Sequence, residues 1–257
     1  MSKPSYLSTA VTGVTNAVSL IHASALPSNL SNSAQTALEA VGLYRTGNAS
    51  DLHCGDIKDI FGFDFVDVGN LWDDEQDGKP EGLTRELIDR ATKWPRTIPA
   101  RRLVSIILNE LLKSVTEVHG MEKLRLSQTV RIRRMTLHGM SVREIHGLID
   151  FSLWYGDMDK METNFIVRLC DNVRASELLA YMGLLQRDQD RLQTKGRGSL
   201  YGLVTDGKQF HFYRLDLENE VRFLKLTWDG SVPQVTWILG VIFRIMESAG
   251  ELSIPCI

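Results

Sequence analysis

Gly147-Leu-Ile-Asp-Phe-Ser-Leu-Trp-Tyr-Gly156 is the stretch of sequence that decides the fold. It is followed by Glu162-Thr-Asn-Phe-Ile-Val-Arg-Leu-Cys170, and both segments are rich in the β-branched and aromatic residues typical of strands. Helical spacing then runs over residues 176–192, and a third apolar segment, Tyr201-Gly-Leu-Val-Thr-Asp-Gly207, ends in a turn signal. Strands interrupted by a helix in this way predict a mixed α/β (α+β) protein.

More helices and strands are predicted on both sides of this segment. Upstream, apolar residues recur at helical period over residues 100–118, and a basic, alternating stretch at 129–137 predicts a strand. Downstream, residues 209–215 and 221–226 predict two more strands, and residues 235–246 predict a helix. From residue 99 onward the predicted order is therefore helix, three strands, helix and further strands.

The first 98 residues differ in composition from the rest of the chain. Residues 1–50 are rich in Ser, Thr, Ala and Asn, with helical spacing that predicts two short helices around residues 27–33. Residues 51–89 are acidic, and Asp73-Asp-Glu-Gln-Asp-Gly78 is typical of an exposed loop. We therefore expect a helical and acidic N-terminal extension over residues 1–98 and an α/β core over residues 99–257.

Global composition limits the classes of function. The 43% hydrophobic and 24% charged residues match a globular protein, and a net charge of −3 gives no overall attraction to nucleic acid or to anionic membranes. Three widely spaced cysteines imply no disulfide framework. The sequence contains no apolar run of about 18 residues, so no membrane partner is expected. Together these features predict an intracellular protein, cytoplasmic or nuclear, rather than a secreted one.

Four phrases carry a resemblance to a known family. Asp150-Phe-Ser-Leu-Trp-Tyr-Gly156, Glu162-Thr-Asn164, Leu178-Leu-Ala-Tyr-Met182 and Tyr201-Gly-Leu-Val-Thr-Asp-Gly207 resemble a group of uncharacterised fungal proteins assigned to the PD-(D/E)XK restriction-endonuclease-like superfamily. The resemblance spans roughly residues 100–245 and implies a restriction-endonuclease-like core. In that superfamily, an acid on one strand and an acid-x-lysine on the next hold one or two Mg²⁺ ions, which activate the attacking water.

The second of these strands departs from the family pattern. Asp150 occupies the first acidic position, but Arg168 and Cys170 stand where the second acid and the lysine are expected. Alternation places Arg168 and Cys170 on one face of the strand, so we expect both to line one cleft with Asp150. A guanidinium repels a divalent cation and pairs with a carboxylate. We therefore expect a degenerate nuclease without metal or cofactor, in which Asp150, Arg168 and Cys170 are the candidate catalytic residues.

The first hypothesis for this cleft is a small-molecule site. Ser152, Trp154 and Ile166 are predicted to line it, and Glu110 is predicted to approach from the helix at residues 100–118. A mostly apolar surface with a few placed polar groups is typical of a ligand pocket. In this hypothesis the protein binds or transforms a small organic metabolite without a metal. The competing interpretation is that Trp154 and Ile166 are core residues.

The second hypothesis is a non-cleaving nucleic-acid- or protein-binding module. Its candidate residues are Arg131, Arg133 and Arg134 in the basic strand, and alternation places Arg131 and Arg133 on one face. The negative net charge ranks this hypothesis second, so nucleic acid is the less favoured partner. The third hypothesis is a residual Mg²⁺-dependent nuclease in which an acid elsewhere, such as Glu110, Glu144 or Glu162, completes the metal site.

Overall fold

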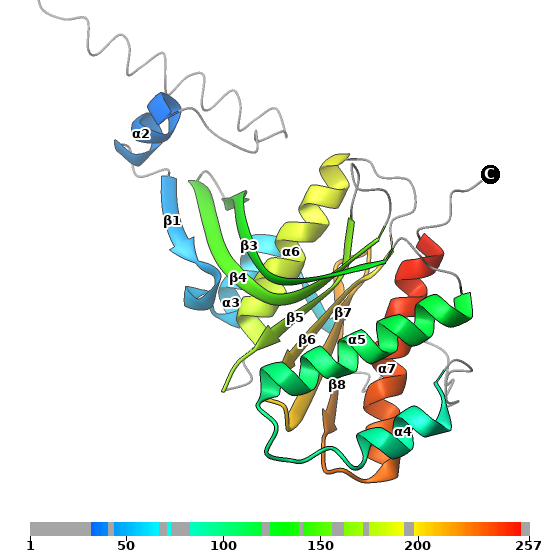
Figure 1. The fold of residues 1–257 in the computed structure, drawn as a ribbon. Coiled ribbons are helices and arrows are strands. Elements are labelled where there is room, and N and C mark those ends of the chain that lie inside the picture. The colour runs from blue at the N-terminus through cyan, green and yellow to red at the C-terminus, as the bar shows by residue number, and fades with distance from the viewer. Residues whose placement is uncertain are drawn as a thin grey trace, which may run out of the picture.

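The computed structural model describes residues 32–40, 44–66, 71–72, 83–119, 124–138, 141–155, 162–171, 175–192 and 198–252. Over these ranges the chain is a mixed α/β structure built on one eight-stranded sheet (Figure 1). The first predicted N-terminal helix and the predicted loop at 73–78 lie outside the described residues. None of the described helices combines the length and the hydropathy needed to cross a membrane.

The described helices and strands follow one another in this order: α2 (Asn32–Ala40), β1 (Tyr44–Asn48), the 3₁₀ turn η1 (Ala49–Asp51), α3 (Cys54–Phe61), β2 (Asp64–Val66), α4 (Arg85–Ala91), α5 (Ala100–His119), β3 (Arg125–His138), β4 (Ser141–Tyr155), β5 (Glu162–Leu169), α6 (Ala175–Leu192), β6 (Leu200–Thr205), β7 (Gln209–Leu215), β8 (Glu220–Thr227) and α7 (Val232–Leu252). The helices and strands that the sequence predicts beyond residue 99 are all confirmed, with shifted ends.

The sheet has the strand order β1-β4-β5-β6-β7-β8-β2, and β3 pairs with β4. β3, β4 and β5 are antiparallel neighbours, α6 connects β5 to the parallel strand β6, and β6, β7 and β8 form an antiparallel meander. β3 pairs along almost the whole of β4, so β1 and β5 share the opposite edge. Between them, residues 147–150 of β4 have no strand partner on that edge among the described residues.

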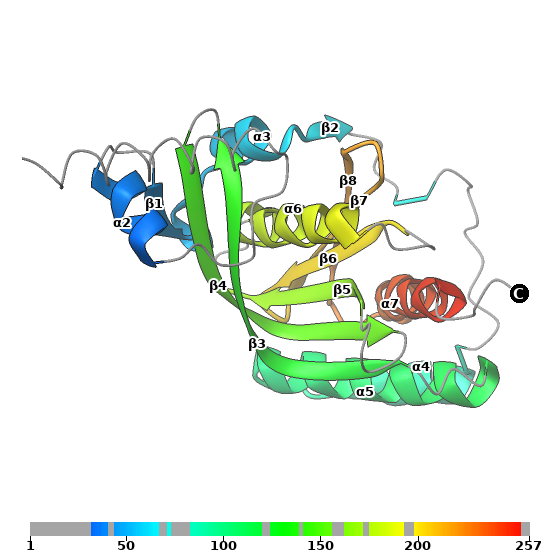
Figure 2. The same ribbon diagram turned by 90° about the horizontal axis from the view of Figure 1, so that it is seen from above.

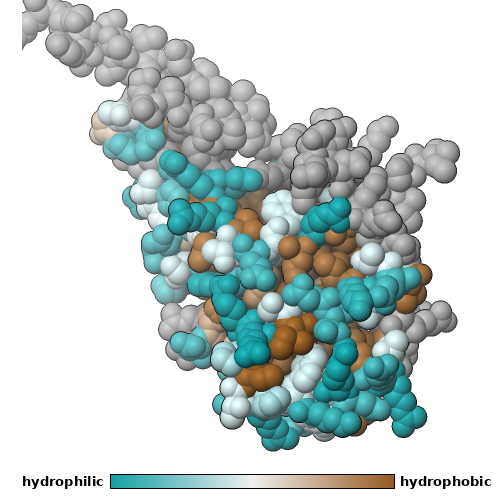
Figure 3. All heavy atoms as spheres, in the orientation of Figure 1, coloured by the Kyte–Doolittle hydropathy of each residue, from teal (hydrophilic) through white to brown (hydrophobic). Residues whose placement is uncertain are grey.

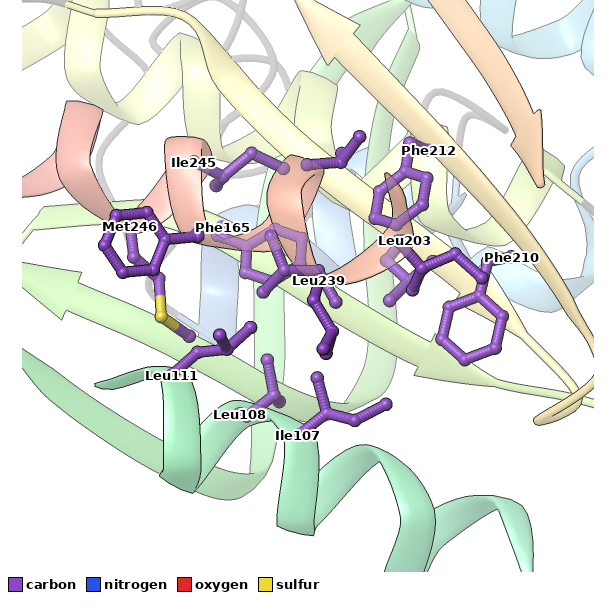
Figure 4. Packing of buried hydrophobic residues seen from close by; sticks show 14 of the residues in the cluster. Ile107, Leu108, Leu111, Phe165, Leu203, Phe210, Phe212, Leu239, Ile245 and Met246 are labelled. Atoms are coloured by element: carbon purple, nitrogen blue, oxygen red, sulfur yellow. The ribbon is translucent and has the colours of Figure 1, made fainter. Parts of the chain in front are cut away.

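Helices cover both faces of the sheet (Figure 2). On one face, the α5–α7 core consists of buried residues of α4, α5 and α7 packed on Phe151, Leu153, Phe165, Val167, Tyr201, Leu203, Phe210, Phe212, Leu224 and Leu226. Figure 4 shows part of this packing, with Ile107, Leu108 and Leu111 of α5 facing side chains of β5, β6, β7 and α7. On the other face, the α6 core consists of buried residues of α3 and α6 packed on Ile132, Ile145, Ile149, Ile166, Leu200, Val204, Tyr213, Leu215 and Val221.

The N-terminal region is built into the same sheet and cores. β1 extends the sheet beside β4, β2 extends it beside β8, and Ile57, Ile60 and Phe63 are buried in the α6 core. Leu71 and Leu83 are buried in the α5–α7 core. The boundary predicted at residue 98 therefore does not separate two hydrophobic cores. The sequence does not predict β1, because Tyr-Arg-Thr-Gly-Asn has no apolar alternation. This strand joins the edge of the sheet through backbone pairing.

Candidate functional site

The candidate site is the fork at which β4 and β5 separate, between the end of β1 and the last β4–β5 pair, Phe151 with Val167. Backbone groups released by a strand fork need new hydrogen-bond partners. One is supplied by α6, because the Tyr181 hydroxyl accepts a hydrogen bond of 2.9 Å from the Leu148 amide. Gly147 makes this approach possible, since a Cβ there would lie 1.7 Å from the same hydroxyl.

Asp150 supplies the second partner. Its Oδ2 accepts a hydrogen bond of 2.8 Å from the Leu169 amide, which closes the fork on the β5 side. The same oxygen accepts a hydrogen bond of 2.7 Å from Arg168, and Oδ1 pairs with Arg101 at 2.5 Å. The Asp150 side chain is only 6% exposed, so its negative charge is balanced by two guanidinium groups rather than by water.

Arg168 connects this carboxylate to α6. Its Nε lies 3.0 Å from an oxygen of Glu177, and the other oxygen of Glu177 accepts a hydrogen bond from the Tyr181 hydroxyl. Burial opposes the charged form of Arg168, but the hydrogen bonds with Asp150 and Glu177 outweigh it and raise the pKa of the guanidinium. Burial, followed by the hydrogen bond with Glu177, raises the pKa of Tyr181. Arg168 is therefore always charged and Tyr181 is a neutral hydrogen-bond donor at neutral pH.

At Asp150 the side chains of β3 and β4 also exchange faces of the sheet: residues of the same parity point to one face before this position and to the other face after it. Ile145 and Ile149 of β4 belong to the α6 core, whereas Phe151 and Leu153 belong to the α5–α7 core, so simple alternation breaks at Asp150. Opposite it, Thr129 of β3 has a φ of 56°, a left-handed conformation that is rare for a β-branched residue. Because of this exchange, the Asp150 carboxylate reaches Arg168 beside α6 and Arg101 at the start of α5.

This arrangement is unsuited to holding a divalent cation. A carboxylate has about four acceptor positions, and three of those of Asp150 are taken by Arg101, Arg168 and the Leu169 amide. The other acids considered for a metal are elsewhere. Glu110 pairs with Arg90, and Glu144 pairs with Arg133. The Glu162 side chain lies outside the described residues. Over the described ranges no group of three His, Cys, Asp or Glu residues is placed to bind a metal ion.

The structure brings together only some of the residues that the sequence singles out. Asp150 and Arg168 are in contact, and Ile166 and Cys170 pack on the α6 face of β5 while Leu169 packs on the other, as alternation predicts. Ser152 and Ile166 are each 1% exposed, so neither lines an open cleft. Glu110 is not part of the fork, because about nine residues of α5 separate it from Arg101, roughly 13 Å along the helix.

Sequence reasoning missed Arg101, Glu177 and Tyr181, the three helical residues that complete the fork network. The only signal in the sequence was local: Arg101 lies in the first turn of one predicted helix, and Glu177 lies in the first turn of the other. A carboxylate in the first turn of a helix is already stabilised by the helix dipole. Its presence there therefore gives no reason to expect a contact with another part of the chain.

A second concentration of charge lies on the end of the sheet beyond the fork. We define the basic arm as β1 together with residues 130–138 of β3 and 141–149 of β4; its arginines are Arg45, Arg131, Arg133, Arg134 and Arg143. Arg45 is directly opposite Arg143 across the β1–β4 pair. Arg131 and Arg133 lie on the face opposite Ile132, which is in the α6 core. Both faces of the arm therefore carry arginine.

Glu144, which pairs with Arg133, is the one acidic residue in the arm's sequence segments. Arg45, Arg131, Arg133 and Arg134 are exposed, and Arg143 is half-buried. In Figure 3, hydrophilic side chains gather over the part of the molecule where β1, β4 and β3 end. The arm is thus a positively charged surface on a chain whose total charge is negative.

Comparison with known proteins adds no identification: no protein-family model matches the chain, and no curated protein matches it.

Proposed function

We propose that this protein is a non-cleaving nucleic-acid-binding module of the restriction-endonuclease-like fold, which holds the phosphate backbone on its basic arm. The observation that carries the proposal is the charge of the arm. Five arginines and one glutamate give it a net charge of 5 − 1 = +4, whereas the whole chain has a net charge of −3. Such a local asymmetry creates an attractive potential for a polyanion that the total charge conceals.

The fold assignment is supported by the order and pairing of the elements. Helix α5, the antiparallel strands β3, β4 and β5, helix α6 and the parallel strand β6 follow the order expected for that core. In this proposal the fork corresponds to the family's metal site. Arg168 there places a positive charge against Asp150, in contact with both the carboxylate and Glu177.

The chemistry of arginine suits the proposed ligand. Its planar guanidinium matches phosphate oxygens in a two-point hydrogen bond and stays charged at every physiological pH. Phosphate contacts of this kind give affinity without sequence preference and release condensed counterions. We therefore expect binding that depends strongly on salt and weakly on sequence.

The small-molecule site favoured by the sequence ranks lower as the main function. Its predicted lining residues Ser152 and Ile166 are buried, and Glu110 points to Arg90 instead of the fork. The negative net charge, which ranks nucleic acid second in the sequence analysis, weighs less because the basic arm carries five arginines and one glutamate.

The test is a binding and cleavage assay on the full chain. Fluorescence anisotropy with end-labelled single-stranded and double-stranded DNA and RNA of one sequence measures affinity at 50–200 mM salt. Gel electrophoresis of the same samples after incubation with Mg²⁺ or Mn²⁺ measures cleavage. We expect saturable, salt-sensitive binding and intact oligonucleotides. Metal-dependent cleavage, or no binding at 50 mM salt, contradicts the proposal.

A further inference from the structure

Two arginines of the basic arm lie side by side without a compensating acid. Arg45 of β1 is directly opposite Arg143 of β4, and neighbouring strands of a sheet are about 4.8 Å apart. Like charges at directly opposed positions destabilise a sheet. Over the ranges that the structure describes, neither guanidinium forms an ion pair or a hydrogen bond. Two positive charges therefore meet here without being neutralised by the chain.

The donors of this pair are open to solvent. Arg45 is exposed. Arg143 is half-buried, but within its guanidinium only Nε is a buried atom without a partner, which leaves the two Nη nitrogens accessible. A ligand from solution can therefore contact both side chains at the surface, and no internal cavity is needed.

The pair belongs to the more positive face of the arm. Ile145 packs in the α6 core, so alternation and strand pairing put Arg143 and Arg45 on the same face. Arg134 is directly opposite Ile145 and shares this face. Glu144, the one acid of the arm, points to the other face. The α6 face of the arm's strands thus carries three arginines and no acid.

We propose that the Arg45–Arg143 pair binds the terminal phosphate of a nucleic-acid strand. The inference rests on the proposed function and names the group that the arm recognises. Both arginines lie within the first three residues of their strands, at the outer end of the sheet (Figure 1). The other arginines of the arm then contact phosphates within the strand.

The charge of the ligand decides for a terminal phosphate. A phosphodiester within a strand has one negative charge and two unbridged oxygens, which suit one guanidinium. A terminal monoester has three free oxygens and a charge of about −1.5 to −2 at neutral pH. It can accept from both guanidiniums and balance both positive charges.

The test compares strand ends on the full chain. One oligonucleotide is prepared with a 5′-hydroxyl, a 5′-phosphate or a 3′-phosphate, each with the same internal fluorescent label, and anisotropy measures the affinity at one salt concentration. We expect one of the two phosphorylated forms to bind about tenfold more tightly than the hydroxyl form. A monoester gains its second proton near pH 6, so this preference should shrink when the pH is lowered from about 7.5 to about 5.

Two variants and one matched control locate the preference. Arg45→Gln and Arg143→Gln each remove one charge of the pair and should lose most of the preference for the phosphorylated end. Arg131→Gln is the control, because it removes one exposed charge from the opposite face of the arm. It should weaken the binding of all forms by the same factor and keep the preference. If Arg143→Gln fails to fold, Arg45→Gln alone decides.

The inference and the proposed function fail in different ways. Equal affinity for all three forms in the wild type overturns the terminal-phosphate site and leaves the proposed function standing, and so does an unchanged preference in Arg45→Gln. The absence of binding to every form overturns both. Inorganic phosphate tests a free anion as the ligand. If it displaces the phosphorylated strand at concentrations below the dissociation constant of that strand, the site is one for free phosphate and the inference is overturned.

Discussion

Removing three arginines from the basic arm tests the proposed function most directly. The variant carries Arg45→Gln, Arg131→Gln and Arg134→Gln, which change exposed side chains on β1 and β3, the two strands that pair with this part of β4. Glutamine keeps much of the length of the side chain and removes its charge. Arg133 is left in place because it pairs with the buried carboxylate of Glu144, so that the variant changes charge without disturbing this pair.

The expected magnitude follows from counterion release. The five arginines lie on both faces of the arm and Arg133 also pairs with Glu144, so five phosphate contacts with a duplex are the upper limit. At that limit the logarithm of the binding constant falls with the logarithm of salt with a slope of about −0.9 × 5, or roughly −4.5. Raising salt fourfold, from 50 to 200 mM, then weakens wild-type binding by about 500-fold. With two contacts left, the slope is about −1.8 and the same change weakens binding by only about 12-fold.

The assay is fluorescence anisotropy with one duplex at four salt concentrations, for wild type, the variant and a matched control. The control removes three positive charges from the α4–α5 side of the molecule through Arg85→Gln, Lys93→Gln and Lys113→Gln, all at exposed positions. It keeps the same net charge as the variant. A control slope as shallow as that of the variant, or a variant slope equal to wild type, refutes the assignment of binding to the arm.

Three further predictions concern the fork and the sheet. Asp150→Asn is expected to lower the free energy of unfolding by about 3 kcal/mol in urea titrations, because a buried carboxylate with three partners is lost; a loss below about 0.5 kcal/mol contradicts the network. Gly147→Ala should cost about 2–4 kcal/mol because the new methyl group collides with the tyrosine ring beneath it, whereas Gly47→Ala, with nothing within 4 Å, should be close to neutral. Burial, and then the charge of Lys225, lower the pKa of His211 from 6.5, so stability that is complete above pH 6.5 falls as the pH drops towards the folded-state value. His211→Gln should make the free energy of unfolding less dependent on pH in this window, and an unchanged profile excludes His211 as the cause.

The sequence predicts the parts of the structure that are set by local periodicity. Alternation along β5 correctly separates Leu169 from Ile166 and Cys170, and helical spacing correctly gives α5 and α6. The contacts of Arg168 with Glu177 and of Asp150 with Arg101 depend on how helices lie across the sheet, which no local pattern encodes. Three of the five arginines of the basic arm already stand together in the sequence at 131–134, whereas Arg45 and Arg143 join them only through the pairing of β1 and β3 with β4.

The buried acid Asp150 has a structural role. Where β4 and β5 separate, the Leu169 amide loses its strand partner and takes the Asp150 carboxylate instead. A buried carboxylate that accepts a backbone N–H still requires a compensating positive charge. Arg168 and Arg101 provide it. The acid and the arginine are therefore coupled, and replacing Arg168 alone with leucine should destabilise the chain more than replacing Asp150 with asparagine and Arg168 with leucine together, which urea titration of the two variants measures. A double variant less stable than the single Arg168→Leu variant would show that Asp150 is held mainly by the backbone amide and Arg101.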